Sequence, residues 1–248
     1  MKVAFVGGGR VVSWQIERLL KATNHQIQGV YDIDKNVLSK YEEKGINSFK
    51  SMNDLIESKP DVISICTPSD AHITSLKEAF NLCPKEQIFT IEKPTFMSLE
   101  DYETAQNFIK EKSIFIFPTF QNRYNNAVRF AKNLLEDREI GNFLHGRINL
   151  SWCRPQRYYE LADWRGKWYS DGGALTNQGI HFIDLARYLF GEIKDVSFRM
   201  DRAEVNIECE NVAIGSLRNH EGRLISIDIN TVSRPDDHNA EITIYGSK

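Results

Sequence analysis

The 248-residue sequence predicts two domains. An α/β domain on a parallel sheet is expected over residues 1–120, and an α+β domain on an open, mostly antiparallel sheet over residues 121–248. Two observations lead to this division. The first half alternates short apolar runs with segments of helical spacing, and repeated βα units of this length imply a parallel sheet covered on both faces. From residue 196 onward, successive strand-like runs are joined by short turns, which is typical of antiparallel sheets.

In the first half, strands are predicted where apolar runs end at a glycine or a polar residue, and helices where apolar residues recur every three to four positions. Ser69 or Asp70 is expected to cap the helix that ends near Leu82. The predicted strands are 2–6, 26–31, 61–66, 87–91 and 114–117, and the predicted helices are 11–20, 35–44, 69–82 and 99–110.

In the second half, the same patterns predict fewer helices and longer strands. A turn at Asn219-His220-Glu221-Gly222 indicates a hairpin. An irregular stretch rich in aromatic and arginine residues is expected after Trp152. The predicted helices are 126–135 and 177–189, and the predicted strands are 143–152, 196–207, 212–217, 224–232 and 241–245.

Composition excludes several classes of protein. The net charge of −3 is spread along the chain, which argues against a nucleic-acid binder that depends on phosphate contacts. No apolar stretch is long enough to cross a bilayer or to act as a signal region, so a cytoplasmic location is expected. The four cysteines form no Cys-x-x-Cys pair, so neither a metal site nor a redox motif is predicted.

A glycine-rich turn opens the chain. Gly7-x-Gly9 directly follows a predicted strand and precedes a helix, where backbone can approach a pyrophosphate and the helix N-terminus can stabilise it. Val12 stands where a third small residue is usual. Asp32 ends the next strand, about 20 residues on, where a carboxylate accepts hydrogen bonds from ribose hydroxyls and repels a 2′-phosphate. With Asp34 close by, this pattern favours a Rossmann-type domain that binds NAD, although Asp32 can also be read as a turn residue.

A lysine and a histidine are the candidate proton-handling residues. Lys93 follows a predicted strand and precedes Pro94, and His181 lies near the start of a predicted helix. Alcohol oxidation requires removal of the hydroxyl proton as hydride leaves carbon, and either side chain can take part. Asn177, one helical turn before His181, cannot accept a proton, and Asp184 either orients a neighbour or is solvated. The alternative readings are a surface lysine and a core histidine.

Arginine and aromatic residues gather in one segment. Three of the four tryptophans lie between Trp152 and Trp168, interspersed with Arg154, Arg157 and Arg165. Arginine binds carboxylate or phosphate through a planar fork, and aromatic rings suit sugar faces and a uracil ring. The segment therefore indicates an anionic sugar ligand, or alternatively a packed domain interface with charges at its rim.

Together these motifs resemble the Gfo/Idh/MocA oxidoreductase family over essentially the whole chain. The resemblance rests on Gly7-x-Gly9, Asp32, Thr67-Pro68-Ser69 with His72, Glu92-Lys93-Pro94 and the segment from Gly172 to His181. It implies an NAD-dependent oxidoreductase that acts on CH–OH groups, with Lys93 and His181 as catalytic residues. The cofactor-binding residues that it implies are Gly7, Gly9, Arg10, Val11, Asp32, Thr67, Pro68, His72, Glu92 and Lys93.

One branch of the family is similar in finer detail. Gln121-Asn122-Arg123-Tyr124-Asn125, Trp152-x-Arg154-Pro155-Gln156-x-Tyr158-Tyr159 and Asn177-Gln178-Gly179-x-His181 resemble the UDP-N-acetylglucosaminuronate 3-dehydrogenases of bacterial surface-polysaccharide (lipopolysaccharide) synthesis. This resemblance implies oxidation of the sugar 3-hydroxyl, followed by an aminotransferase. The implied substrate-binding residues are Lys93, Arg123, Tyr124, Arg154, Tyr159, Arg165, Asn177 and His181.

The chain is shorter than is usual in the family, which leads us to expect a C-terminal truncation. Family members usually continue past Ile244-Tyr245-Gly246 and form homo-oligomers through the open sheet, so the short end puts this assembly in question. Two alternatives stay open. One is a dehydrogenase of another sugar or polyol, such as an inositol, and the other is a catalytically silent NAD-binding protein.

Overall fold

The computed structural model describes residues 1–22 and 24–248, which form two compact units, Met1–Thr119 and Phe120–Lys248. The first unit contains a six-stranded sheet in the order β3-β2-β1-β4-β5-β6, and every strand pair is parallel. Because the order runs outward from β1 in both directions, this is the predicted Rossmann-type arrangement. The strands are β1 (Lys2–Val6), β2 (Gln26–Tyr31), β3 (Ser48–Phe49), β4 (Val62–Ile65), β5 (Ile88–Ile91) and β6 (Phe115–Pro118).

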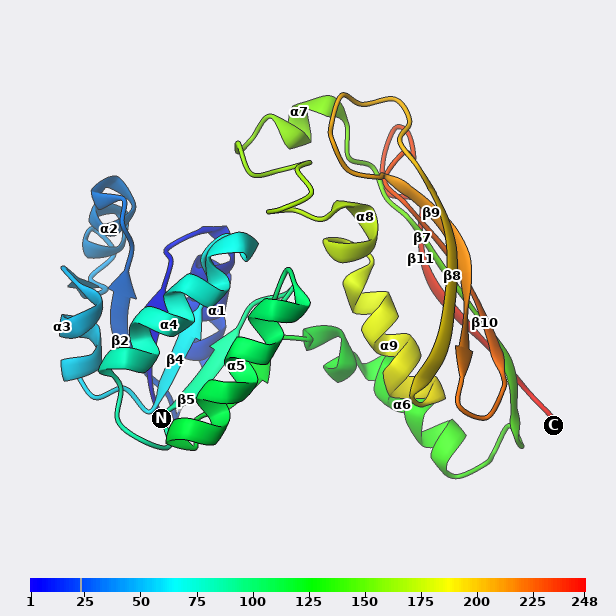
Figure 1. Cartoon of the computed structure of the whole chain (residues 1–248), viewed down its shortest axis with the longest axis horizontal. Coiled ribbons are helices and arrows are strands. Elements are labelled where there is room, and N and C mark those ends of the chain that lie inside the picture. The colour runs from blue at the N-terminus through cyan, green and yellow to red at the C-terminus, as the bar shows by residue number, and fades with distance from the viewer. Residues whose placement is uncertain (23) are drawn as a thin grey trace. The chain divides into compact units, whose positions relative to one another are not determined.

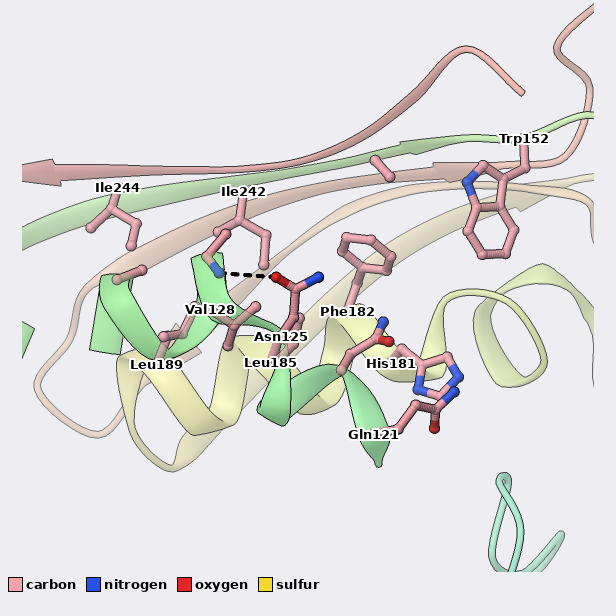
Figure 2. Close-up of a pocket in the computed structure, with 14 residues that line it drawn as sticks. Gln121, Asn125, Val128, Trp152, His181, Phe182, Leu185, Leu189, Ile242 and Ile244 are labelled. Carbon is pink, nitrogen blue, oxygen red and sulfur yellow. Dashed lines mark hydrogen bonds between the residues drawn. The ribbon is translucent and has the colours of Figure 1, made fainter. Parts of the chain in front are cut away.

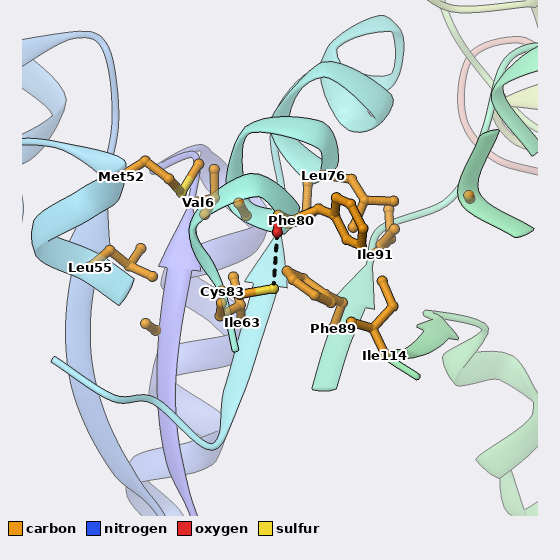
Figure 3. Packing of buried hydrophobic residues seen from close by; sticks show 14 of the residues in the cluster. Val6, Met52, Leu55, Ile63, Leu76, Phe80, Cys83, Phe89, Ile91 and Ile114 are labelled. Carbon is orange, nitrogen blue, oxygen red and sulfur yellow. Dashed lines mark hydrogen bonds between the residues drawn. The ribbon is translucent and has the colours of Figure 1, made fainter. Parts of the chain in front are cut away.

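Helices cover both faces of this sheet, because the apolar side chains of β1 point alternately to one face and the other and are buried on both. Ala4 and Val6 pack into a core with α3 (Met52–Glu57), α4 (His72–Leu82) and α5 (Leu99–Lys112), part of which Figure 3 shows. Val3 and Phe5 point to the opposite face, where they pack with α1 (Arg10–Lys21) and α2 (Lys35–Glu42). Successive strand residues point to opposite faces, so the apolar runs of β1 and β4 bury both sides.

Val12 explains the departure from the usual glycine-rich pattern. Its side chain is fully buried and packs with Val3, Phe5 and Val30, on the face of α1 that meets the sheet. A third glycine at this position would leave that volume empty, so the valine has a structural role in this chain.

The second unit is a five-stranded sheet with helices along one face (Figure 1). Its order is β11-β7-β10-β9-β8, and all neighbouring strands are antiparallel except β10 and β7. This confirms the predicted open, mostly antiparallel sheet. The strands are β7 (Phe143–Ser151), β8 (Ile193–Asp201), β9 (Val212–Asn219), β10 (Leu224–Asn230) and β11 (Asn239–Gly246), and the helices are α6 (Asn126–Glu136), α7 (Gln156–Tyr159), α8 (Gly173–Thr176) and α9 (Ile180–Phe190).

One face of the second sheet is apolar and the other mostly polar. Ile148, Leu150, Ile225 and Ile227 pack against Phe182 and the rest of α9. The alternate residues Arg147 and Asn149 of β7 and Ser226 and Asp228 of β10 form the opposite face, because strand residues alternate between faces.

Three local predictions were wrong. Strand β8 ends at Asp201, its last residue paired with β9, and the loop beyond it is held by Asn211, which bonds the backbone of Ala203 through both side-chain atoms. Helix α9 starts at Ile180 because Gly173–Thr176 forms a separate turn. Neither Ser69 nor Asp70 caps α4 through its side chain, since a 3₁₀ turn, η1 (Ser69–Ala71), precedes that helix.

We predict that Val12→Gly destabilises the first unit by about 2–4 kcal/mol. The loss combines a buried valine side chain with the poor helix propensity of glycine. The free energy of unfolding from urea titrations would measure it. Glu17→Gly at an exposed position of α1 is the control and should cost only about 1 kcal/mol. Equal losses in the two variants would contradict the assignment of Val12 to the core.

Candidate active site

The turn after β1 contains two glycines, and each is needed for a different structural reason. Gly7 has φ of +87°, and a Cβ on it would lie 2.8 Å from backbone atoms of Cys66 and Thr67, so the fold itself requires glycine. A Cβ on Gly9 would meet nothing within 4 Å. Gly9 therefore leaves open space beside the start of α1, at Arg10, where unpaired backbone N–H groups favour a phosphate. Val11, also predicted to contact the cofactor, lies partly buried in the first turn of α1.

Asp32 is fixed against this turn. Its Oδ2 accepts a hydrogen bond from the Gly8 backbone N–H at 2.6 Å, and its Oδ1 accepts one from the Asp34 N–H at 2.8 Å. Each carboxylate oxygen has a second lone pair, so both can still accept from ribose hydroxyls. Asp34 instead caps α2 by accepting from the Asn36 N–H. The residues at this edge fit the adenosine half of NAD.

His72 lies inside the first unit, between two of the predicted cofactor loops. It is 1% exposed, and its ring nitrogens lie 2.9 Å from the carbonyl oxygen of Thr67 and 3.0 Å from that of Pro94. Burial lowers the pKa of His72, while these carbonyls oppose that shift. The buried ring of His72 therefore connects the loop that carries Thr67 and Pro68 with the loop that carries Pro94.

Glu92 and Lys93 extend from the end of β5. The Glu92 backbone N–H donates to Ile65 of β4 at 3.0 Å, which fixes the start of the turn. The Glu92 carboxylate accepts from the side-chain amide of Gln15 at 2.6 Å and from the Lys93 N–H at 3.3 Å. Burial raises the pKa of Glu92. Gln15 was not among the predicted site residues, because nothing in the local sequence of α1 indicates that it reaches a residue 77 positions away.

In the second unit, His181 lies at the polar end of a pocket of about 430 Å³ (Figure 2). It is 7% exposed, and the Phe120 ring meets its imidazole edge-on at 6.2 Å. Gln121, Asn122 and Asn125 also line this pocket, whose remaining walls are Trp152 and apolar side chains of α6, α9 and β11. The helix that carries His181 is therefore packed firmly at its start, as a proton-handling residue requires.

Two buried carboxylates shape the turn before His181. A Cβ on Gly173 would lie 1.9 Å from the Glu210 carboxylate, so that carboxylate explains the second glycine of the motif. Glu210 accepts from the Leu175 N–H at 2.9 Å, and burial raises its pKa. Asp171, 2% exposed, accepts from the Gly166 N–H and from the side-chain amide of Asn177. Sequence reasoning missed both carboxylates, because Glu210 acts on a residue 35 positions away and Asp171 is recognised only through its bonds to Gly166 and Asn177.

Two of the predicted arginines stack around one tyrosine. The guanidinium carbon of Arg165 lies 4.3 Å from the Tyr158 ring centroid and 4.5 Å from that of Trp164. Arg154 lies 5.3 Å from the Tyr158 ring and donates to Asp237 at 2.9 Å. Within the described part of the chain, Arg165 has no carboxylate partner. Arg154 and Arg165, together with the single carboxylate of Asp237, therefore have a net charge of +1.

Three further predicted substrate residues belong to the second unit, and one of them, Tyr159, packs edge-on against Tyr158 at 5.1 Å between ring centroids. Arg123 binds Asp184 through two hydrogen bonds of 2.7 and 2.5 Å, so its planar fork is already occupied. Tyr159 is buried, with its hydroxyl 3.1 Å from that of Thr231. Tyr124 is 78% exposed.

Residues 1–22 and 24–248 contain no helix of the length and apolarity that a bilayer span needs. Over the same residues, no group of three or more histidine, cysteine, aspartate or glutamate side chains is arranged to hold a metal ion.

Comparisons with known proteins agree on one family. Residues 1–120 match the model for the oxidoreductase family, NAD-binding Rossmann fold, and residues 128–248 match that for the GFO/IDH/MocA C-terminal domain. The crystal structure of the WlbA dehydrogenase from Bordetella pertussis, in complex with NADH and UDP-GlcNAcA, is 28% identical with a TM-score of 0.93, covering 100% of this chain and 72% of that one.

Two curated enzymes are also similar over the full chain. Glucose-6-phosphate 3-dehydrogenase of Bacillus subtilis is 26% identical, covering 100% of this chain and 72% of the enzyme. Myo-inositol 2-dehydrogenase of Thermotoga maritima is 25% identical, covering 100% of this chain and 73% of the enzyme.

The two glycines of the first turn should respond differently to alanine. Gly9→Ala should leave the free energy of unfolding nearly unchanged but weaken NAD binding about tenfold or more, because its Cβ enters the space beside the start of α1. Gly7→Ala should destabilise the first unit by more than about 1 kcal/mol, because alanine is strained at this φ. Urea titration and calorimetry with NAD would measure both effects. Unchanged NAD affinity in Gly9→Ala would contradict this site.

Proposed function

Because the chain belongs to the Gfo/Idh/MocA family of oxidoreductases, we propose that it oxidises the 3-hydroxyl of UDP-N-acetylglucosaminuronate. The broader activity follows from the family: the chain is an NAD-dependent dehydrogenase of sugar or polyol hydroxyls. The particular sugar is the proposal, and it is supported by the similarity to a dehydrogenase crystallised with this nucleotide sugar.

The stack of Arg154 and Arg165 around Tyr158 is the observation that carries the proposal. A nucleotide-sugar uronate presents a carboxylate, a diphosphate and a uracil ring, whereas an inositol presents only hydroxyls. Arginine forks suit the anionic groups and aromatic rings suit flat surfaces. A neutral polyol would give this cluster no anion to bind, so the excess positive charge favours the charged sugar.

The proposed reaction needs one hydride and one proton to leave the sugar. When bound, NAD supplies the acceptor for the hydride from carbon 3. The hydroxyl O–H bond breaks as the carbonyl forms, and the proton passes to Lys93 or His181, either of which can act as the base. Lys93 is held at the end of β5 and His181 at the start of α9, so each is placed by a rigid element.

The other predicted residues are proposed to bind the two ligands. Gly7, Gly9, Arg10 and Val11 would surround the diphosphate of NAD, and Asp32 would accept from its ribose. Thr67, Pro68 and Glu92 would form the wall near the nicotinamide, supported from inside by His72. On the substrate side, the proposal retains Arg154, Arg165 and Asn177 in direct roles. The occupied fork of Arg123 and the buried ring of Tyr159 suit them to shaping the site, and Tyr124 is accessible to ligand.

A dehydrogenase with this substrate would act in the cytoplasm, in the synthesis of bacterial surface polysaccharides. Its 3-keto product would suit an aminotransferase as the next enzyme. Self-association through the open sheet stays a prediction, which sedimentation analysis of the chain would test.

Absorbance at the reduced-nicotinamide band, with NAD and UDP-N-acetylglucosaminuronate, is the direct test. A rise, even of one turnover per site, would support the proposal. A rise only with glucose 6-phosphate or with myo-inositol would show that this compound is the substrate and that the nucleotide sugar is not. No rise despite NAD binding would favour a silent NAD-binding protein.

Substitution of either proton-handling residue should slow the chemical step and leave NAD binding unchanged. Lys93→Met and His181→Gln should each lower kcat by about 10²–10⁴-fold, the usual contribution of a general acid or base. The Kd for NAD, measured by calorimetry, should change little. Lys85→Met, at an exposed lysine of the same unit as Lys93, is the control. Wild-type rates in both site variants would show that the site has been placed wrongly.

Loss of the arginines should weaken the binding of an anionic nucleotide sugar. Arg165→Met should raise the KM for UDP-N-acetylglucosaminuronate by about 10–100-fold, the effect of losing a hydrogen-bonded charge. Arg154→Met should have a smaller effect, because Asp237 already binds its guanidinium. Initial rates with UDP-N-acetylglucosamine, which lacks the uronate carboxylate, separate the two anionic groups. An equal effect on both substrates would assign Arg165 to the diphosphate, and no effect on either would remove it from the site.

A further inference from the structure

The Glu92 carboxylate is held on both of its oxygens, immediately before the proposed catalytic lysine. Oε1 accepts from Gln15 at 2.6 Å, and Oε2 accepts from the Lys93 backbone N–H at 3.3 Å. The first contact is much the shorter and comes from another element, the helix α1 that begins at the dinucleotide turn. Gln15 is thus the tertiary contact that fixes the rotamer of Glu92.

The amide of Gln15 is itself held in one orientation. Its Oε1 accepts from the hydroxyl of Ser64 on β4 at 3.2 Å, while its Nε2 donates to Glu92. A flipped amide would place its carbonyl oxygen against the Glu92 carboxylate and its NH₂ against the hydroxyl. Since the carboxylate accepts only, this network specifies one orientation. Ser64 is buried in the sheet, so the network is anchored in the core.

Helix α1 brings Gln15 to this position through its own packing. Val12 and Ile16, on either side of Gln15 in the sequence, are buried against the sheet. Gln15 lies at the margin of that buried face and is itself partly buried. The packing of α1 on the sheet therefore fixes the backbone from which the Gln15 side chain reaches Glu92.

We propose that Gln15 is a positioning residue, which holds the Glu92 carboxylate beside Lys93 and so sets the electrostatic environment of that lysine. The inference rests on the proposed catalytic role of Lys93. Gln15 is assigned no contact with either the cofactor or the substrate.

The charges around Glu92 determine the direction of the effect. Burial raises the pKa of Glu92, whereas the Lys93 N–H, the Lys93 charge and the Gln15 amide lower it. The buried thiol of Cys66 faces Glu92 from the end of β4, and burial raises the pKa of that thiol to about 12, so it stays neutral. His72 contacts the carbonyl of Pro94 on the other side of the turn.

Loss of the Gln15 donor should therefore raise the pKa of Glu92. A Glu92 side chain that is more often protonated gives Lys93 less stabilisation of its ammonium form. Because the interaction of two charges is reciprocal, the pKa of Lys93 should fall. We expect the change at Glu92 to be about one unit, the size of one hydrogen bond to a charged group, and the fall at Lys93 to be smaller, because it is transmitted through Glu92.

Gln15→Met tests this inference, because methionine keeps the length of glutamine and lacks its amide. Carbon-13 NMR titration of the full chain with NAD would follow the Glu92 carboxyl and the Lys93 ε-carbon, assigned with Glu92→Gln and Lys93→Arg. In an active enzyme, the limb of the pH–rate profile that depends on Lys93 should move to lower pH by the same amount as the pKa of Lys93. The Kd for NAD should stay within about twofold, since tenfold corresponds to a whole hydrogen bond.

Three comparisons decide the outcome. Glu17→Met, at an exposed position of α1, should leave both titrations unchanged. In a Glu92→Gln background, Gln15→Met should no longer move the Lys93 titration. If Gln15→Met fails to fold, Gln15→Asn, whose shorter amide falls short of Glu92, replaces it. Unchanged titrations in a folded variant would overturn the role of Gln15 even in an active enzyme. Shifted titrations in a chain without turnover would support that role while the proposed substrate fails.

Discussion

The parallel register of the first sheet is the constraint on which the cofactor side of the site depends. One cross-strand row joins Tyr31, Val6, Ile65, Ile91 and Pro118, so the strands β2, β1, β4, β5 and β6 end level with one another. The backbone bonds of the next residues continue this row, with Gly7 donating to Tyr31, Cys66 to Val6 and Glu92 to Ile65. Motifs up to 85 positions apart thereby reach one edge, and ligands of open α/β sheets bind at this edge.

A buried and a partly buried carboxylate lie beside the turns that this chemistry needs. Glu92 receives donors from Gln15 and Lys93 in the first unit, and Glu210 receives the N–H of Leu175 in the second. Burial raises the pKa of both carboxyls, which means that each is ionised less readily than in water. A buried acid that is only partly compensated costs stability. That cost is common at functional sites, where a fixed charge orients other groups.

The sequence predicted what depends on local pattern and composition. The two sheets, their parallel and antiparallel character, the family, the enzyme class and the NAD cofactor are all confirmed. Three features escaped prediction because they depend on side-chain contacts that the local sequence pattern does not show. Strand β8 ends early, where the Asn211 side chain hydrogen-bonds to the backbone of the following loop. Position 173 is glycine because a Cβ there would clash with the Glu210 carboxylate. Gln15 is recognised as part of the site only through its hydrogen bond to Glu92. The choice among site residues stays a prediction, since it depends on bound ligands.

The arginines show why residue type alone does not define a binding site. Arg123 and Arg165 both lie near aromatic residues, and both suit an anion on sequence grounds. In the fold, Asp184 fills the fork of Arg123, so the pair is internally neutral and binding a second anion there would require that ion pair to break. Arg165 is stacked between two aromatic rings, which hold its plane in place without neutralising its charge. The Arg165 guanidinium donates to the Tyr158 hydroxyl but to no carboxylate among the described residues, so a ligand anion at Arg165 would not have to displace a protein carboxylate.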